Sequence, residues 1–287
     1  MKIGVIDIGS NSVRLMLWAD GKTLYKKLHT TRLGDGLSFS TRLKIEAIER
    51  TVAAVADFKC QALADGADEV YAYATAAVRS SENGCDFVAE VLRNCGIVVD
   101  VLSGEQEAAV SLAGALGTGD GGIIDVGGAS TEVTVRIDGK VIYSHSANVG
   151  TVRILDAAGR DLGKIREFIS GKILEYGGDK FPKVKFYAVG GTASRLGAVK
   201  HGLTVYRPDI INGTELSAIE IHGYAKRLTS LPVEEIKRTT ICQNSADLIG
   251  GGACLMAMVM DKFGIEKITV SESDNLEGYL AEKILKR

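Results

Sequence analysis

Two short segments of the chain place an aspartate, glycines and hydroxyl side chains directly after an apolar run. The first is Asp7-Ile8-Gly9-Ser10-Asn11-Ser12, and the second is Asp125-Val126-Gly127-Gly128-Ala129-Ser130-Thr131-Glu132. Glycines permit a tight turn whose backbone amides can approach a guest closely. A turn of free amides flanked by carboxylates offers what a phosphate group and its Mg²⁺ ion need. The two segments therefore predict phosphate-binding turns.

These two turns match each other position by position. When Asp7 is aligned with Asp125, the turn glycines and serines coincide as well, with Gly9 on Gly127 and Ser12 on Ser130. One glycine-rich turn would be weak evidence, but a matched pair with aspartates in register indicates an internal duplication. A turn-capping role is the ordinary explanation for either aspartate alone. For the pair we predict shared coordination of Mg²⁺ through water molecules.

Other residues could add to this chemistry. Gly190-Gly191-Thr192 lies between a strand and a helix start, where unpaired amides attract anions, although close helix–strand packing explains the glycines equally well. Arg79 follows a strand and could clamp a phosphate with two bonds, although most lone arginines are solvated. Glu105 and Glu107 lie two residues apart in the first turn of a helix and cannot share a face. Spacing alone does not decide which could act as a base.

Composition indicates a globular protein. The 287 residues suffice for one large or two ordinary domains. A net charge of −2 argues against a general binder of nucleic acid or membrane surfaces. The five cysteines form no CxxC pair and, with no secretory signal, suggest reduced thiols and a cytoplasmic protein. The apolar stretch 248–260 is too short and too glycine-rich to span a bilayer.

The elements expected around the turns repeat in two halves, each opening with three strands. In the first half we expect strands at 2–6, 13–17, 22–31, 69–74 and 97–102, and helices at 41–64, 86–94 and 103–116. In the second half we expect strands at 122–126, 132–137, 140–147, 185–189 and 267–271, and helices at 151–156, 162–176, from 190, 214–228, 233–238, 245–263 and 274–285. The domains are predicted as 1–118 and 119–287, and the last helix, about 274–287, could pack back on the first domain.

Several sequence blocks, taken together and in order, resemble the exopolyphosphatase/guanosine pentaphosphate phosphatase (Ppx/GppA) family in its short form, without a C-terminal helical extension. The blocks are DIGSNSVRL at 7–15, ATAAVRSSENG at 74–84, LSGEQEA at 102–108, DVGGASTE at 125–132, GGT at 190–192 and ADLIGGG at 246–252. The resemblance implies an α/β fold of two duplicated actin-like (ribonuclease H-like) domains of the ATPase superfamily, with a cleft between them.

The same resemblance implies a phosphohydrolase that releases terminal phosphate from inorganic polyphosphate or from guanosine pentaphosphate, with Mg²⁺ or another divalent cation as cofactor. Glu107, by its place in LSGEQEA, would be the catalytic base. Glu132 would help hold the metal ion or the attacking water, and Asp7 and Asp125 match the metal-side aspartates. The phosphate-binding positions matched in the family are Ser10, Asn11, Arg79, Gly127, Gly128, Ala129, Ser130 and Thr131. The glycine-rich segments described above add further phosphate-binding candidates, which are Gly9, Ser12, Gly190, Gly191 and Thr192.

Departures from the family pattern leave two other functions open. Ser245 stands where an arginine is usual, and Asn275-Leu276-Glu277-Gly278 replaces the usual GLREG. One alternative is therefore a non-catalytic sensor of polyphosphate or alarmones. The other is an ATP-using sugar or acetate kinase-like enzyme, against which the LSGEQEA block argues. We expect polyphosphate or guanosine pentaphosphate as ligand and no nucleic-acid or membrane partner, and a homodimer is compatible with the sequence.

Overall fold

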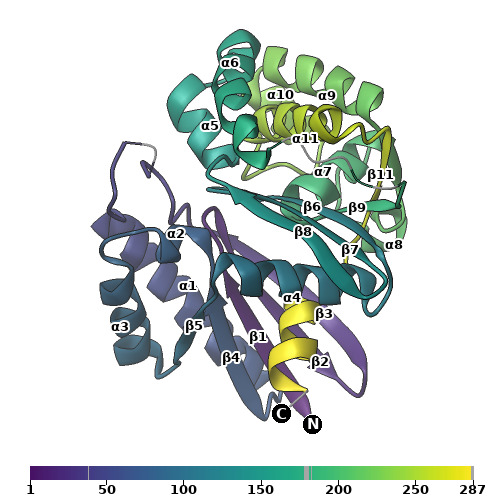
Figure 1. Cartoon of the computed structure of the whole chain (residues 1–287). Coiled ribbons are helices and arrows are strands. Elements are labelled where there is room, and N and C mark those ends of the chain that lie inside the picture. The colour runs from purple at the N-terminus through teal and green to yellow at the C-terminus, as the bar shows by residue number, and fades with distance from the viewer. Residues whose placement is uncertain (38, 178–180, 182, 286–287) are drawn as a thin grey trace. The chain divides into compact units, whose positions relative to one another are not determined.

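The computed structural model describes residues 1–37, 39–177, 181 and 183–285 and divides into two compact units, Met1–Glu107 and Ala108–Arg287 (Figure 1). The division falls inside helix α4 (Gly104–Leu116), earlier in the chain than the glycine-rich boundary predicted at residue 118. Residues 286–287, the end of the expected last helix, lie outside the described residues. Each unit contains one mixed sheet with its own helices.

The first unit is built on a five-stranded sheet in the order β3-β2-β1-β4-β5. The first three strands form an antiparallel meander, and β4 and β5 join it in parallel. The strands are β1 Lys2–Ile8, β2 Ser12–Ala19, β3 Lys22–Thr30, β4 Glu69–Ala74 and β5 Val99–Val101. The helices before α4 are α1 Ile45–Ala64, α2 Ala76–Arg79 and α3 Gly84–Cys95.

The core of the first unit fixes which way the β1 side chains point. Ile6 and Ile8 belong to the apolar cluster that also contains Val55 and Phe58 of α1. Successive side chains of a strand point to opposite faces of the sheet. Asp7 therefore points to the opposite face from these isoleucines, directly across the ladder from Arg14 of β2.

The second unit repeats this topology. Its six-stranded sheet has the order β10-β11-β9-β6-β7-β8. Read from β8, the order β8-β7-β6-β9-β11 reproduces that of the first sheet, including an antiparallel meander followed by parallel strands. The predicted α/β duplication is therefore confirmed. The strands are β6 Gly121–Val126, β7 Thr131–Ile137, β8 Lys140–Ala147, β9 Phe186–Val189, β10 Glu215–Ser217 and β11 Lys267–Val270.

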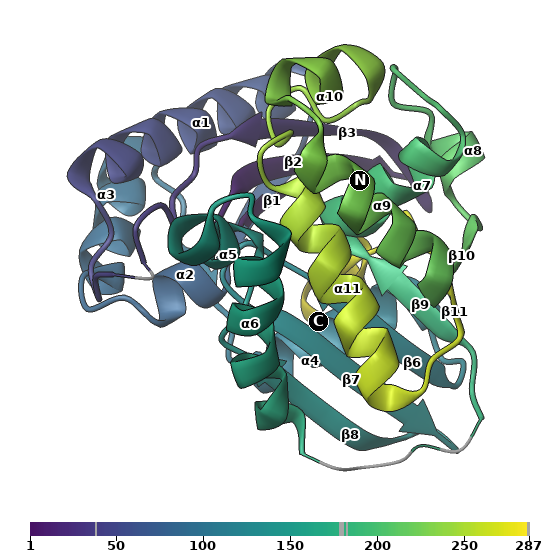
Figure 2. The same cartoon turned by 90° about the horizontal axis from the view of Figure 1, so that it is seen from above.

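Helix α11 is the central helix of the second unit. Figure 2 shows it lying between α6 and α9. Three consecutive glycines, Gly250 to Gly252, allow close packing, because Cβ atoms there would press on residues of α5, α7 and α9. In the described part of the chain, no helix combines the length and apolar character needed to cross a membrane. The helices are α5 Thr151–Ala158, α6 Leu162–Lys172, η1 Ile173–Tyr176, α7 Gly190–Lys200, α8 Pro208–Ile211, α9 Ala218–Ser230, α10 Val233–Thr239, α11 Ile249–Phe263, α12 Asn275–Tyr279 and η2 Leu280–Ile284.

Long-range hydrogen bonds explain where the element predictions were wrong. The helix expected from residue 41 begins at Ile45, because the Asn83 side chain bonds both the amide and the carbonyl of Leu43 and holds that segment outside the helix. The helix expected from residue 214 begins at Ala218. Residues 215–217 pair with β11 instead, and Ser217 caps α9 in a reciprocal box with Glu220. The short helices α2 and α8 were not predicted.

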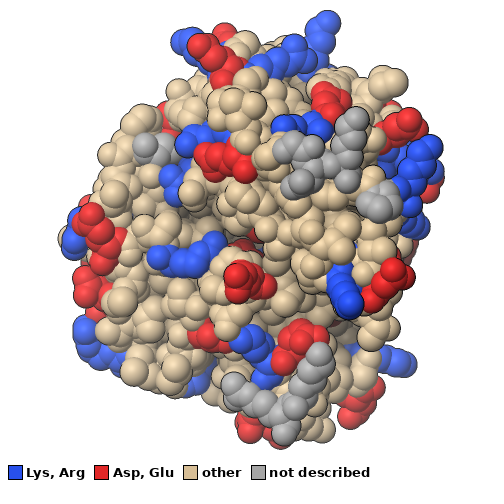
Figure 3. All heavy atoms as spheres, in the orientation of Figure 1, with Lys and Arg blue, Asp and Glu red and all other residues tan. Residues whose placement is uncertain are grey.

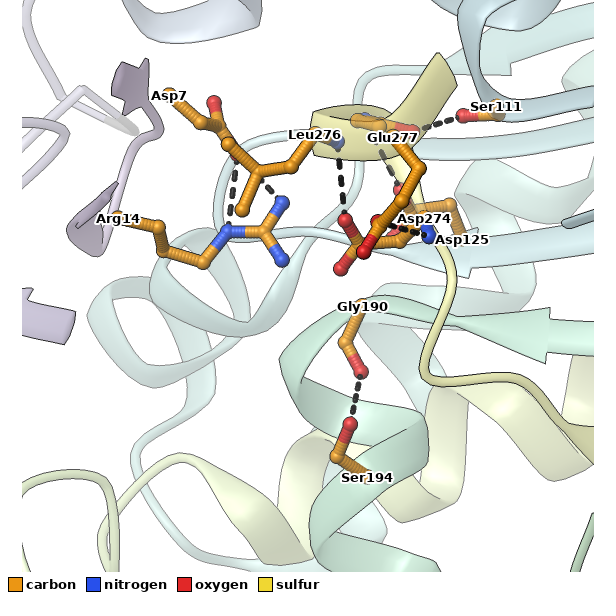
Figure 4. A network of polar contacts seen from close by, with 10 residues as sticks. Asp7, Arg14, Ser111, Asp125, Gly190, Ser194, Asp274, Leu276 and Glu277 are labelled. Carbon is orange, nitrogen blue, oxygen red and sulfur yellow. Dashed lines mark hydrogen bonds and ion pairs between the residues drawn. The ribbon is translucent and has the colours of Figure 1, made fainter. Parts of the chain in front are cut away.

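Helix α12 touches α4 at the level of the backbone. A Cβ atom on Gly278 would overlap the carbonyl oxygen of Val110, and one on Gly114 would overlap that of Asp274. Asp274 caps α12 by accepting from the Leu276 amide at 3.0 Å, and Glu277 accepts from the Asp274 amide at 3.1 Å (Figure 4). The start of α12 is therefore fixed against the later part of α4.

We expect Gly278→Ala to destabilise the protein by about 1–3 kcal/mol or more, because the added methyl group has no space. Gly223→Ala is the matched control, since Gly223 lies in α9 with nothing within 4 Å of its Cβ position. At that exposed position inside a helix, alanine should stabilise the protein by about 0.5–1 kcal/mol. Thermal denaturation measures both variants. A melting temperature for Gly278→Ala as high as that for Gly223→Ala would contradict the close packing of α12 on α4.

Candidate active site

The two predicted turns close with the same hydrogen bond. The Gly9 amide donates to the Ser12 carbonyl oxygen at 3.0 Å, and the Gly127 amide donates to the Ser130 carbonyl oxygen at 3.0 Å. In both turns a Cβ on the glycine would lie 3.1 Å from that same carbonyl oxygen. The alignment of Gly9 with Gly127 and of Ser12 with Ser130 thus holds in three dimensions as well as in sequence.

The carbonyl groups of both turns are used by the segments that follow. Asn11 O accepts from two amides of the loop after β3, and Ser10 O accepts from the Gly34 amide. In the second turn, Gly127 O and Gly128 O accept from the first amides of α5. These hydrogen bonds hold the backbone of each turn in place, so the shape of the turn does not depend on a ligand.

Two other amides in each turn make no such hydrogen bond among the described residues. The amides of Ser10, Asn11, Gly128 and Ala129 donate to no residue that the structure describes. Ser10 and Ala129 are nearly buried, at 6% and 2% exposure. Buried amides are almost always bonded in folded proteins, to water or ligand where the protein offers no acceptor. These amides are therefore suited to an anion.

Asp7 carries a close ion pair. Arg14 donates to Asp7 Oδ2 from Nε at 3.0 Å and from Nη2 at 2.5 Å (Figure 4). The aspartate side chain is 7% exposed and the arginine side chain 19%. The expected metal-side role of Asp7 stays a prediction, and any cation there would share the carboxylate with Arg14.

Asp125 and Glu132 lie side by side on one face of the second sheet. The β6–β7 register pairs them directly, and the β7–β8 register pairs Glu132 with Ser146. Directly opposed side chains of an antiparallel pair share a face, about 4.5–5.5 Å apart at Cβ. Glu132 is 5% exposed and accepts from Ser146 Oγ at 2.6 Å. Burial and then the charge of Glu132 raise the pKa of Tyr176, whose hydroxyl donates to Thr131 O.

Two neighbours enclose the Asp125 carboxylate. A Cβ on Gly190 would lie 2.6 Å from Asp125 Oδ1, so only glycine fits there, and its φ of +81° also favours glycine. On the other side, Asn275 Nδ2 faces Asp125 Oδ2 at 3.5 Å. Gly190 thus has a definite role beside Asp125, which its place before a helix alone did not reveal.

The structure distinguishes the two glutamates that spacing could not. Glu105 is exposed, whereas Glu107 is 5% exposed. Ser103 and Gln106 form a capping box at the start of α4. Arg79 Nη1 donates to Glu107 Oε2 at 2.8 Å and to Leu102 O at 2.7 Å. Arg79 Nε and Nη2 bond to no residue in the described ranges, so this face of the guanidinium remains open to an anion.

Some predicted phosphate-binding hydroxyls serve the fold. Thr131 Oγ1 donates to Val149 O at 2.7 Å, and Thr192 Oγ1 donates to Val126 O at 2.9 Å. While these bonds last, both threonines can offer only backbone amides to a phosphate. The Asn11 Oδ1 atom, in contrast, is buried and makes no hydrogen bond within the described part of the chain. An amide oxygen can accept a hydrogen bond from a water molecule or a ligand.

The residues fit a Mg²⁺ ion that relies on substrate and water for most of its ligands. Among the described residues, no group of three or more His, Cys, Asp and Glu side chains could hold a metal ion. Mg²⁺ usually binds through one or two carboxylates, with water and substrate phosphates completing its shell. The adjacent carboxylates of Asp125 and Glu132 suit that mode.

The face shown in Figure 3 carries lysine and arginine interspersed with aspartate and glutamate. Neither sign forms a continuous patch among the atoms coloured there. An anion on this face must therefore be bound by local groups rather than by a broad basic surface. Individual arginines then matter more than the net charge.

Sequence reasoning missed four residues that support the site. Arg14 could have been found, because a hairpin closed between Gly9 and Ser12 places it opposite Asp7. Ser146 follows in the same way from the β7–β8 register. Asn275 and Ser111 could not, since their hydrogen bond joins residues 164 positions apart.

Comparison with known proteins places this arrangement in a family. A model of the Ppx/GppA phosphatase family matches residues 18–287. The chain belongs to the Ppx/GppA phosphatase family. It is therefore a phosphatase, as the sequence resemblance implied.

Relatives and solved structures agree with this assignment. Exopolyphosphatase 2 of Mycobacterium tuberculosis is 28% identical over 310 residues, which cover 96% of this chain and 97% of that protein. A bifunctional 3-dehydroquinate synthase/phosphatase of Fusobacterium nucleatum is 28% identical over 309 residues, or 97% of this chain. This chain spans only 46% of the length of that relative.

The crystal structure of a Ppx/GppA family member from Aquifex aeolicus superposes with a TM-score of 0.77 and 27% identity, covering 100% of this chain and 98% of that one. An exopolyphosphatase structure from Cytophaga hutchinsonii gives a TM-score of 0.84 at 21% identity, covering 98% and 97%. At that identity the second match supports the fold alone. The fold of this chain is thus that of Ppx/GppA proteins.

Proposed function

We propose that the protein releases the terminal phosphate of inorganic polyphosphate, or of guanosine pentaphosphate, by attack of water assisted by a divalent cation. Membership of the Ppx/GppA phosphatase family and the exopolyphosphatases among its relatives support the substrate class. The observation that carries the proposal is the buried Glu107 held by Arg79. A buried carboxylate fixed by one arginine nitrogen, with the other nitrogens open, suits a base beside a phosphate.

Glu107 is the proposed general base. It orients a water molecule and accepts its proton while the water oxygen attacks the terminal phosphorus in line with the leaving oxygen. Arg79 Nη1 keeps Glu107 in place, and Nε and Nη2 are the donors that a phosphate oxygen could meet.

The turns and the carboxylates of Asp125 and Glu132 complete the proposal. Phosphoryl transfer is accelerated mainly by positioning and by stabilising charge on the phosphate oxygens. The available turn amides would bind those oxygens. A divalent cation bound by Asp125 and Glu132 would supply further charge neutralisation.

The test is phosphate release from short polyphosphate, long polyphosphate, guanosine pentaphosphate and ATP, each with Mg²⁺ and with chelator. We expect release from polyphosphate or guanosine pentaphosphate that chelator abolishes, and little release from ATP. Tight binding of polyphosphate without phosphate release at any Mg²⁺ concentration would contradict the proposal and indicate a non-catalytic sensor. Transfer of phosphate from ATP to a sugar or acetate would replace it with a kinase.

A further inference from the structure

A short row of buried polar side chains ends at the carboxylate of Asp125. The Ser111 hydroxyl of α4 donates to Asn275 Oδ1, and Asn275 Nδ2 faces Asp125 Oδ2 at 3.5 Å (Figure 4). Ser111 is 2% exposed and Asn275 is 5% exposed. All three residues belong to the second unit. Buried polar groups arranged in this way usually fix the orientation of the group at the end of the row.

The neighbours of Asn275 decide which way its amide points. An ionised carboxylate can only accept hydrogen bonds, so the amide must present its NH₂ group to Asp125. Oδ1 then faces away, where the Ser111 hydroxyl donates to it. The 3.5 Å separation is at the outer limit of a hydrogen bond. The amide therefore steers the carboxylate by its dipole as well as by direct bonding.

Helix α12 holds Asn275 at this distance. Asn275 is the first residue of α12, directly after the capping residue Asp274. The glycine contacts at Gly114 and Gly278 bring the backbones of α4 and α12 together without intervening side chains. Because neither helix can approach further, the place of Asn275 relative to Ser111 is set by main-chain contact.

We propose that Asn275 is a positioning residue that orients the Asp125 carboxylate for a divalent cation, with Ser111 as its anchor. The inference rests on the proposed function, in which Asp125 binds the cation. Gly190 leaves space for Oδ1, while Asn275 faces Oδ2, so the carboxylate plane is defined from both sides. Mutating a residue that orients a metal-binding side chain typically lowers metal affinity or activity by about 10–100-fold.

The experiment measures Mn²⁺ binding to the full chain by electron paramagnetic resonance, without substrate, together with the melting temperature without metal. Three variants are compared: Asn275→Leu, Ser111→Ala and the double variant. Asn275→Leu and the double variant should bind Mn²⁺ about tenfold more weakly than the wild type. Ser111→Ala should weaken Mn²⁺ binding less than Asn275→Leu does, because the amide of Asn275 loses its anchoring hydroxyl while Nδ2 can still face Asp125.

The melting temperatures separate positioning from simple packing. Asn275→Leu should melt lower, since the Ser111 hydroxyl loses its acceptor. The double variant should recover much of that loss, because both partners become apolar, yet its Mn²⁺ affinity should stay low. A double variant that melts and binds Mn²⁺ like the wild type would overturn the inference.

The variant Asp125→Asn separates the positioning role of Asn275 from the metal-binding role of Asp125. If it weakens Mn²⁺ binding while Asn275→Leu does not, only the positioning role fails. If Asp125→Asn leaves Mn²⁺ binding unchanged, the metal role of Asp125 in the proposed function fails, and the positioning role fails with it.

Discussion

Replacing Glu107 with glutamine should reduce phosphate release by about 10²–10⁴-fold, the usual contribution of a general base. Glutamine keeps the size of the side chain and can still accept from Arg79 Nη1, but it cannot take a proton from water. Substrate binding should change little. Steady-state phosphate release together with equilibrium binding of polyphosphate separates the two effects.

Glu105→Gln is the matched control for that variant. It makes the same chemical change in the first turn of the same helix, but Glu105 is exposed. Its turnover should stay close to that of the wild type. Near-normal turnover by Glu107→Gln, or an equal loss in both variants, would refute Glu107 as the base.

Replacing Arg79 with methionine should affect both stability and activity. Removing one partner of a buried ion pair costs about 3–5 kcal/mol, and we expect about 2–3 kcal/mol because the Arg79 side chain is 27% exposed. Activity should fall by at least about tenfold, since Glu107 loses its positioning partner and the phosphate loses a donor. Denaturant unfolding and phosphate release measure the two effects.

The double variant Arg79→Met with Glu107→Gln tests the cause of the instability. It should recover much of the lost stability, because no buried charge is left without a partner. Arg93→Met is the matched control: its ion pair with Glu90 is on the surface, with side chains 69% and 36% exposed. Its loss should stay below about 1 kcal/mol. A double variant as unstable as Arg79→Met alone would show that the ion pair is not the reason.

Local chemistry made the two turns predictable from sequence. The end of an apolar strand, a glycine whose amide closes the turn and a serine whose carbonyl oxygen accepts that hydrogen bond follow one another closely in the sequence, so no distant contact is needed to shape the turns. The same holds for the capping box of α4, where Ser103 and Gln106 lie three residues apart. Duplication of the fold followed because the strand patterns around both turns are alike.

Contacts between distant residues were beyond sequence reasoning. The side chain of Asn83 moves the start of α1 through Leu43, 40 positions earlier. Asn275 meets Asp125 from 150 positions away, in a segment where the sequence showed only the loss of an arginine. In the structure, Leu276 of that segment is buried. The sequence suggested only a phosphate-binding role for Arg79. Its hydrogen bond to Glu107 is seen in the structure, where the end of α2 lies beside the start of α4.

In the proposed reaction, water attacks the terminal phosphorus of the substrate chain. The most direct measurement is hydrolysis of polyphosphate in ¹⁸O-labelled water, followed by mass spectrometry of the orthophosphate and of the shortened chain. We expect one labelled oxygen in each orthophosphate released and none in the shortened chain. Label in the shortened chain, or release of unlabelled orthophosphate, would contradict it.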